Sequence, residues 1–241
     1  MFVSAVCAKV EACTAFFRFF PMSLAPIEIE TAPQPTASVI VLHGLGADGN
    51  DFVPIARELD LSGAGAVRFV FPNAPEIPVT INGGRPMPAW YDIMVPDLTR
   101  REDEAGLRRS QAAIEALIAN ERARGIPAHR IVLAGFSQGC AMALMTGLRH
   151  GERLAGIVGL SGYLPLAATL EAERHGANHQ TPVFLAHGTH DNVVVLARAT
   201  ATRDALQALG HPVEWHEYPM QHSVSIEEIA DLNAFLLRVL S

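Results

Sequence analysis

The stretch Ile131-Val132-Leu133-Ala134-Gly135-Phe136-Ser137-Gln138-Gly139 decides the fold that we expect for this chain of 241 residues. Its first four residues are apolar and predict a buried strand, and the residues from 138 to 149 predict a helix. Between them lies a G-x-S-x-G turn, which joins a strand to a helix so sharply that its serine protrudes at the carboxyl end of the sheet. The pattern therefore makes Ser137 the candidate nucleophile.

The rest of the chain alternates short apolar runs with amphipathic stretches. Strands between helices, with near-continuous apolar sequence, are typical of a mostly parallel sheet with helices on both faces. We expect one α/β domain over residues 22–241, a closing helix with Ser225 as its N-cap and Glu228 as capping-box partner, and a long loop over 72–96. Strands are predicted at 38–42, 67–71, 131–134, 157–160, 183–186 and 213–218, and helices at 52–59, 104–124, 138–149, 197–209 and 225–240.

Composition excludes several classes of protein. Hydrophobic residues make up 49% of the chain and charged residues 18%, which is typical of a globular domain and not of a disordered one. The net charge is −7 with no basic run, so nucleic acid is not an expected partner. The three cysteines, Cys7, Cys13 and Cys140, form neither a disulfide framework nor a metal-ligand pattern. A reducing cytoplasm is the compartment that we expect.

Residues 1–21 differ in character from the rest. They are apolar but interrupted by Lys9, Glu11 and Arg18, so they contain no stretch approaching the ~20 apolar residues of an integral membrane span. They also lack the ordered regions of a secretory signal. We interpret them as an atypical extension from a start codon placed too early, with Met22 as the true beginning; a weak membrane-surface helix is the alternative.

A serine hydroxyl needs a base beside it and an acid that orients the base. When a serine lies on this type of turn, the acid and then the histidine are expected to follow along the chain, each on a loop after a strand. Asp191 follows the strand 183–186, and His222 follows the strand 213–218. The sequence therefore predicts Ser137, Asp191 and His222 as a catalytic triad.

Other acids and histidines fit this pattern less well. Asp204 lies within a predicted helix and is expected to face solvent. His190 stands one residue from Asp191 and is the strongest competitor of His222 for the role of base. His43 is expected to shape a turn, and Asp48 to cap one locally, without a part in the chemistry.

The negative charge that develops on an attacked carbonyl needs two N–H donors. The backbone N–H of Gln138, the residue after the serine, is one candidate. The other is the backbone N–H of Leu45, in the glycine-rich loop 43–49. Ile81 and Trp90, in the long loop, are candidates for one wall of a substrate pocket; the alternative is that Trp90 and Tyr91 belong to the ordinary core.

With these residues assembled, the sequence resembles the bacterial carboxylesterase and acyl-protein thioesterase (lysophospholipase-like) family of α/β-hydrolases, from about residue 38 to the C-terminus. The segment 78–84 looks more like the bacterial esterase branch than the eukaryotic depalmitoylating one. Cys140 departs from the family, which usually has glycine there, and we expect tighter packing as the result. The resemblance is carried by segments 42–49, 71–75, 90–92, 135–139 and 160–162, by His187-Gly188 with Asp191, and by His222.

The resemblance implies an α/β-hydrolase fold, the triad and oxyanion donors above, and no cofactor or metal. It also implies hydrolysis of short- to medium-chain acyl esters or thioesters of small molecules. We expect a serine carboxylesterase with an acyl-enzyme on Ser137. An acyl-protein thioesterase or lysophospholipase is the alternative, and a catalytically silent binding protein of the same fold a remote one. The oligomeric state stays open, a homodimer included.

Overall fold

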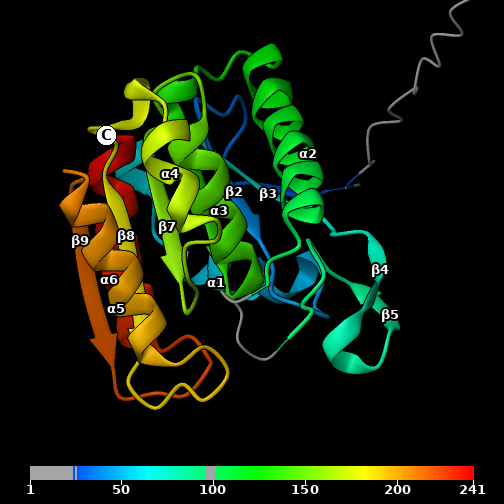
Figure 1. Ribbon diagram of the computed structural model, residues 1–241. Coiled ribbons are helices and arrows are strands. Elements are labelled where there is room, and N and C mark those ends of the chain that lie inside the picture. Colours follow the sequence, from blue (N-terminus) through cyan, green and yellow to red (C-terminus); the bar gives the residue numbers. More distant parts are fainter. Residues whose placement is uncertain (1–23, 25, 96–100) are drawn as a thin grey trace, which may run out of the picture.

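The computed structural model describes Leu24, residues 26–95 and residues 101–241, and the prediction for residues 1–21 lies outside this part. A seven-stranded sheet forms its centre, in the order β1-β3-β2-β6-β7-β8-β9 (Figure 1). Strand β1 runs antiparallel to β3, and all other neighbours are parallel. The strands are β1 (Ile27–Glu30), β2 (Ala37–Leu42), β3 (Val67–Phe71), β6 (Ile131–Phe136), β7 (Gly156–Leu160), β8 (Val183–Gly188) and β9 (Val213–Tyr218).

Helices cover both faces of this sheet, as predicted. One apolar core lies between the sheet and α2 to α5, and a second lies between the sheet and α1 with α6. No helix among the described residues is both long enough and apolar enough to cross a membrane. The helices are α1 (Val53–Glu58), α2 (Glu104–Ala123), α3 (Gln138–Arg149), α4 (Ala167–Glu173), α5 (Leu196–Ala208) and α6 (Ile226–Leu240).

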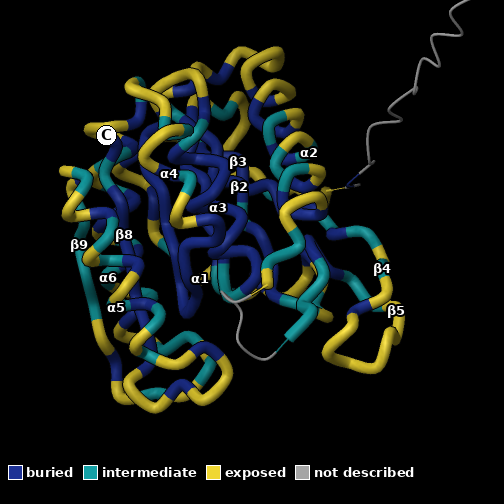
Figure 2. Tube along the Cα trace, viewed as in Figure 1, coloured by how far each residue is buried: buried dark blue, intermediate teal, exposed yellow. Residues whose placement is uncertain are grey.

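Helix α3 lies at the centre of its layer and is buried from Gln138 to Leu148 (Figure 2). It packs closely on the sheet: a Cβ added at Gly147 would lie 2.7 Å from Cδ1 of Ile157 on β7. A helix held on all sides has a fixed N-terminus. The turn that precedes α3 is therefore held rigidly at the carboxyl end of β6.

The structure differs from the expected elements in three places. The predicted long loop over 72–96 contains a two-stranded antiparallel ribbon, β4 (Glu76–Val79) with β5 (Arg85–Pro88). Pro78 and Pro86 lie opposite each other in it, and prolines argue against a central strand but are tolerated where a strand has a free edge. Strand β1 and helix α4 were also not predicted, because each is short and has only a weak apolar pattern.

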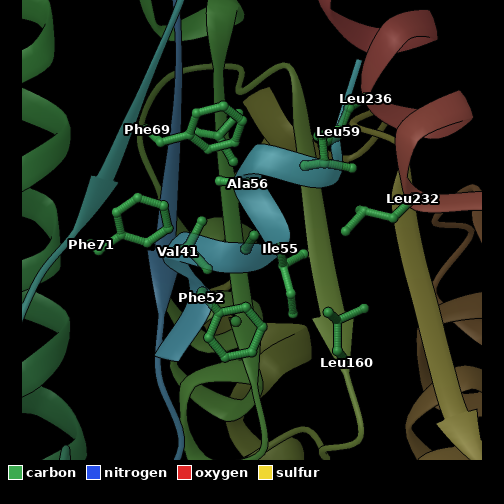
Figure 3. Close-up of a pocket in the computed structure, with 13 residues that line it drawn as sticks. Val41, Phe52, Ile55, Ala56, Leu59, Phe69, Phe71, Leu160, Leu232 and Leu236 are labelled. Carbon is green, nitrogen blue, oxygen red and sulfur yellow. The ribbon is translucent and has the colours of Figure 1, made fainter. Parts of the chain in front are cut away.

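A small apolar cavity lies on the α1 and α6 face of the sheet (Figure 3). Its volume is about 30 Å³, and its lining includes Val41, Phe52, Ile55 and Leu232. Because hydrocarbon side chains line it, it offers no group for acid–base or nucleophilic chemistry. It is a packing gap of the second core.

The N-terminus of α6 has the predicted serine cap, in which Ser225 Oγ accepts a hydrogen bond from the N–H of Glu228 at 3.2 Å. The Glu228 side chain is fully buried. Burial raises the pKa of its carboxyl from 4.5 to about 8, and the backbone N–H of Ser225 offsets only part of this effect. Near neutral pH the folded protein therefore retains a proton on Glu228.

This proton makes stability depend on pH. A carboxyl whose pKa is higher in the folded state than in the unfolded state stabilises the fold when protonated, and this contribution is lost as pH rises. Between about pH 5 and pH 8, we expect the unfolding free energy of wild type to fall by on the order of 3 kcal/mol relative to Glu228→Gln. Urea unfolding of both proteins at the two pH values measures this difference. Parallel pH dependence in the two proteins would contradict it.

Candidate active site

Ser137 lies in the turn between β6 and α3 with φ 55° and ψ −116°. A positive φ is rare for a residue with a side chain and marks strain at a functional position. The turn closes this tightly only because glycines flank it. A Cβ at Gly135 would lie 2.1 Å from the carbonyl oxygen of Gly139, and one at Gly139 would lie 2.0 Å from the carbonyl oxygen of Leu42. The sequence pattern thus produces the strained turn that it predicts.

A chain of two hydrogen bonds joins the three predicted triad residues. Nε2 of His222 lies 2.9 Å from Oγ of Ser137, and Nδ1 of His222 lies 2.6 Å from Oδ2 of Asp191. Strands β6, β8 and β9 are parallel, so the loops that carry these side chains leave the same edge of the sheet. The Phe136 ring packs on the His222 ring with centroids 4.8 Å apart. This geometry allows proton transfer from the serine to the imidazole.

The Asp191 carboxylate is fully buried and held by the turn that it begins. Its Oδ1 accepts the backbone N–H groups of Val193 at 2.8 Å and Val194 at 2.9 Å, and its Oδ2 faces His222. Hydrogen bonds to both oxygens fix the orientation of the carboxylate. It can hold one tautomer of His222, with the proton on Nδ1 and the lone pair of Nε2 toward Ser137.

The competing candidates lie elsewhere. His190 is exposed, and its Nδ1 is 3.4 Å from the Thr189 hydroxyl. Asp204 forms an exposed ion pair with Arg203 on α5, as expected for a solvated position. Asp48 caps the short turn after it by accepting the N–H of Asn50 at 2.7 Å, which confirms its local role.

The loop that carries Leu45 is fixed by hydrogen bonds on both sides. The N–H of Gly46 donates to the carbonyl of Pro88 at 2.8 Å. His43 is buried; its Nδ1–H donates to Gly44 O at 2.7 Å, and its Nε2 accepts the N–H of Ala74 at 2.9 Å. Burial lowers the pKa of His43, in accord with this neutral form. His43 therefore shapes the turn, as predicted.

Gln138 contributes its side chain as well as its backbone. As the first residue of α3, its N–H has no partner within the helix. Its buried side chain bonds the neighbouring loop twice: Oε1 accepts the N–H of Trp90 and Nε2 donates to the carbonyl of Tyr91, both at 2.7 Å. The amide thereby ties residues 90 and 91 to the turn of Ser137.

We expect Gln138→Leu to lower kcat/KM by about 10- to 100-fold, because an active site displaced by about 1 Å loses activity on this scale. The variant retains the backbone N–H but not the two side-chain hydrogen bonds. Kinetics with a chromogenic acyl ester measure the loss. Equal activity in wild type and Gln138→Leu would refute the role.

A pocket of about 460 Å³ opens at Ser137. Of the two residues expected in its wall, Ile81 lines it and Trp90 does not; the candidate oxyanion donors Leu45 and Gln138 also belong to the lining. The prediction for Trp90 is corrected: the residue is 1% exposed, and its Nε1–H donates to the carbonyl of His43 at 2.8 Å, so it belongs to the core behind the site. The other residues of the pocket lining are Asn82, Tyr91, Ile93, Tyr163, Asn192, Val193, Val194, Val195 and Arg198.

Several of these pocket residues gave no usable sequence signal. The hydroxyls of Tyr91 and Tyr163 lie 2.8 Å apart although the residues are 72 positions apart. Burial raises the pKa of Tyr163 to about 12 and raises the pKa of Tyr91 well above its usual value, so both phenols stay protonated. The apolar run 193–195 after Asp191 was a signal for a second pocket wall that our prediction did not use.

Cys140, the departure from the family pattern, is buried in the first turn of α3. A Cβ added at Gly162, after β7, would lie 2.4 Å from the Cβ of Cys140. The larger side chain is thus accommodated by direct contact with a glycine, in agreement with the expected tight packing. Burial raises the pKa of the Cys140 thiol, so it stays protonated.

A mostly parallel sheet, helices on both faces and a serine on a strained strand-to-helix turn define the class: this is an α/β-hydrolase fold. The family model of phospholipases and carboxylesterases matches residues 25–240, and the chain belongs to that family. It is therefore a hydrolase of carboxylic ester or thioester bonds.

Curated relatives and solved structures agree with this assignment. Acyl-protein thioesterase 1 of Yarrowia lipolytica is 40% identical over 86% of this chain and 93% of its own length. Acyl-protein thioesterase 1 of Neurospora crassa is 42% identical over 88% of this chain and 90% of its own length. Among structures, acyl-protein thioesterase 2 of Zea mays superposes with a TM-score of 0.78 at 29% identity, over 89% of this chain and 99% of its own. Esterase PE8 superposes with a TM-score of 0.72 at 30% identity, over 85% of this chain and 93% of its own.

Proposed function

We propose that this protein is an acyl thioesterase that also cleaves the corresponding oxygen esters, through an acyl-enzyme on Ser137. The observation that carries the proposal is the hydrogen-bonded series Asp191–His222–Ser137, whose serine lines a pocket formed largely by apolar side chains. The similarity to acyl-protein thioesterases favours the thioester over the short-chain ester that the sequence led us to expect first.

In the proposed first step, Oγ of Ser137 attacks the acyl carbonyl while Nε2 of His222 takes its proton. The backbone N–H groups of Leu45 and Gln138 donate hydrogen bonds to the carbonyl oxygen and stabilise its negative charge. His222 then returns the proton to the leaving sulfur or oxygen, and the thiol or alcohol departs. Asp191 stabilises the imidazolium that exists between these two events.

Water completes the cycle in the same site. His222 takes a proton from a water molecule, and the resulting hydroxide attacks the carbonyl carbon of the acyl-enzyme. The tetrahedral intermediate uses the same two N–H groups. Its collapse releases the carboxylic acid and returns the proton to Ser137, so no cofactor enters the proposed reaction.

The volume and the apolar lining of the pocket support an acyl chain as the bound group. Its volume lies in the range of small-ligand pockets. Three apolar residues of its lining are also solvent-exposed: Ile81 at 42%, Val193 at 62% and Val195 at 48%. An acyl chain that covers them removes apolar surface from water, which stabilises the complex. A leaving group that stays outside the pocket can then be as large as a peptide.

A matched pair of substrates tests the proposal. One peptide carries an octanoyl group on a cysteine sulfur, and the other carries it on a serine oxygen at the same position. We expect hydrolysis of both, with the larger kcat/KM for the thioester. Hydrolysis of the oxygen ester alone would contradict the thioesterase assignment and leave the esterase reading.

A further inference from the structure

A second histidine lies beside the Asp191 carboxylate. His187, in β8, is fully buried, and its Nε2 is 2.7 Å from the carbonyl oxygen of Val194 and 3.4 Å from Oδ2 of Asp191. A carbonyl oxygen can only accept a hydrogen bond, so Nε2 of His187 carries the proton. The proposed triad does not use this ring.

His187 completes the hydrogen bonding of the turn that carries the acid. The N–H of Val194 donates to Oδ1 of Asp191 at 2.9 Å, and the carbonyl of Val194 accepts from His187 at 2.7 Å. The backbone of Val194 is therefore fixed through its N–H by Asp191 and through its carbonyl by His187 of β8. Since Val193, Val194 and Val195 line the pocket, one turn both holds the carboxylate and forms a wall for the acyl group.

The same Nε2–H group, whose hydrogen bond goes to the carbonyl of Val194, also lies near the Asp191 oxygen that accepts from His222. At 3.4 Å its positive edge complements the charge on Oδ2 of Asp191. A second proton on the ring would place an N–H on Nδ1, a buried atom with no hydrogen-bond partner among the described residues. Burial accordingly lowers the pKa of His187. The neutral ring with Nε2–H is thus a permanent donor that does not compete with His222 for the serine proton.

We propose that His187 is a positioning residue, which holds the Asp191 carboxylate toward His222 and fixes the pocket wall at Val194. The proposal rests on the function proposed for Ser137, Asp191 and His222. In a purely space-filling role, the volume of the buried ring would determine activity. In the proposed role, the N–H donor of His187 determines it.

Two substitutions separate these roles. His187→Leu fills space without a donor, whereas His187→Gln places an amide N–H₂ near the position of Nε2. With a thioester of a short acetyl group, we expect His187→Leu to lower kcat by about 10- to 100-fold, the scale of a small misplacement, with little change in KM. His187→Gln is expected to recover most of that loss. Leu170→Ala, a buried substitution on α4, is the control for lost stability alone and is expected to retain wild-type kcat below its Tm.

The proton between His222 and Asp191 gives a second readout. The short 2.6 Å hydrogen bond predicts a strongly downfield proton NMR signal. We expect the signal to shift or broaden in His187→Leu and to persist in His187→Gln and Leu170→Ala. Unchanged kcat and signal in His187→Leu, or equal losses in the Leu and Gln variants, would overturn the positioning role.

The result also distinguishes this inference from the proposed function. If Asp191→Asn is inactive while His187→Leu is fully active, the triad stands and the inference alone falls. If Asp191→Asn is itself fully active, the result contradicts the function proposed for the triad, independently of His187.

Discussion

Replacement of Ser137 by alanine is expected to lower kcat by about 10⁶-fold, as the loss of a nucleophile does in serine hydrolases with a triad. The substitution removes the hydroxyl that lies 2.9 Å from Nε2 of His222, so the imidazole has no serine proton to accept. Residual hydrolysis then depends on water and the two N–H donors alone. Steady-state rates with an octanoyl thioester measure the loss.

Ser161→Ala is a matched control for this substitution. Ser161 follows the neighbouring strand β7, is buried and also has a positive φ, 48°. Its hydroxyl has no hydrogen-bond partner among the described residues, so we expect this variant to retain most activity. An active Ser137→Ala variant would exclude Ser137 as the nucleophile.

Asp191→Asn is expected to lower kcat by about 10⁴-fold although the side chain has the same shape. An amide nitrogen that faces His222 donates a hydrogen bond, and Nδ1 must then accept it. The proton moves to Nε2, which can no longer accept from Ser137. Rates with the same thioester, compared with Asp204→Asn on the exposed side of α5, measure the effect; a loss of less than tenfold would contradict the orienting role.

The sequence predicted the elements that bury continuous apolar surface. Strands β2, β3 and β6 to β9 have near-continuous apolar runs or border strong turn signals. The G-x-S-x-G turn predicted its own geometry, because only glycine tolerates approaches of 2.0 to 2.1 Å at the Cβ position. Parallel strands place their carboxyl ends along one edge, so the order of Ser137, Asp191 and His222 along the chain predicted that they would meet.

Contacts between distant segments could not be predicted in this way. Trp90 lies in a loop rich in proline and glycine, where an aromatic residue suggests a pocket wall, yet hydrogen bonds to Gln138 and to the loop of His43 place it in the core. The approach of Tyr163 to Tyr91 and of His187 to Val194 depends on how turns close in three dimensions. No periodicity in the sequence encodes such contacts.

The central claim is that a single activated serine, Ser137, performs the chemistry, and an active-site-directed fluorophosphonate tests it most directly. We expect one phosphonyl group per chain, located on Ser137 by peptide mass spectrometry, with activity lost in proportion to labelling and no labelling of Ser137→Ala. Stoichiometric labelling of a different residue together with loss of activity, or full activity after Ser137 is labelled, would contradict the claim.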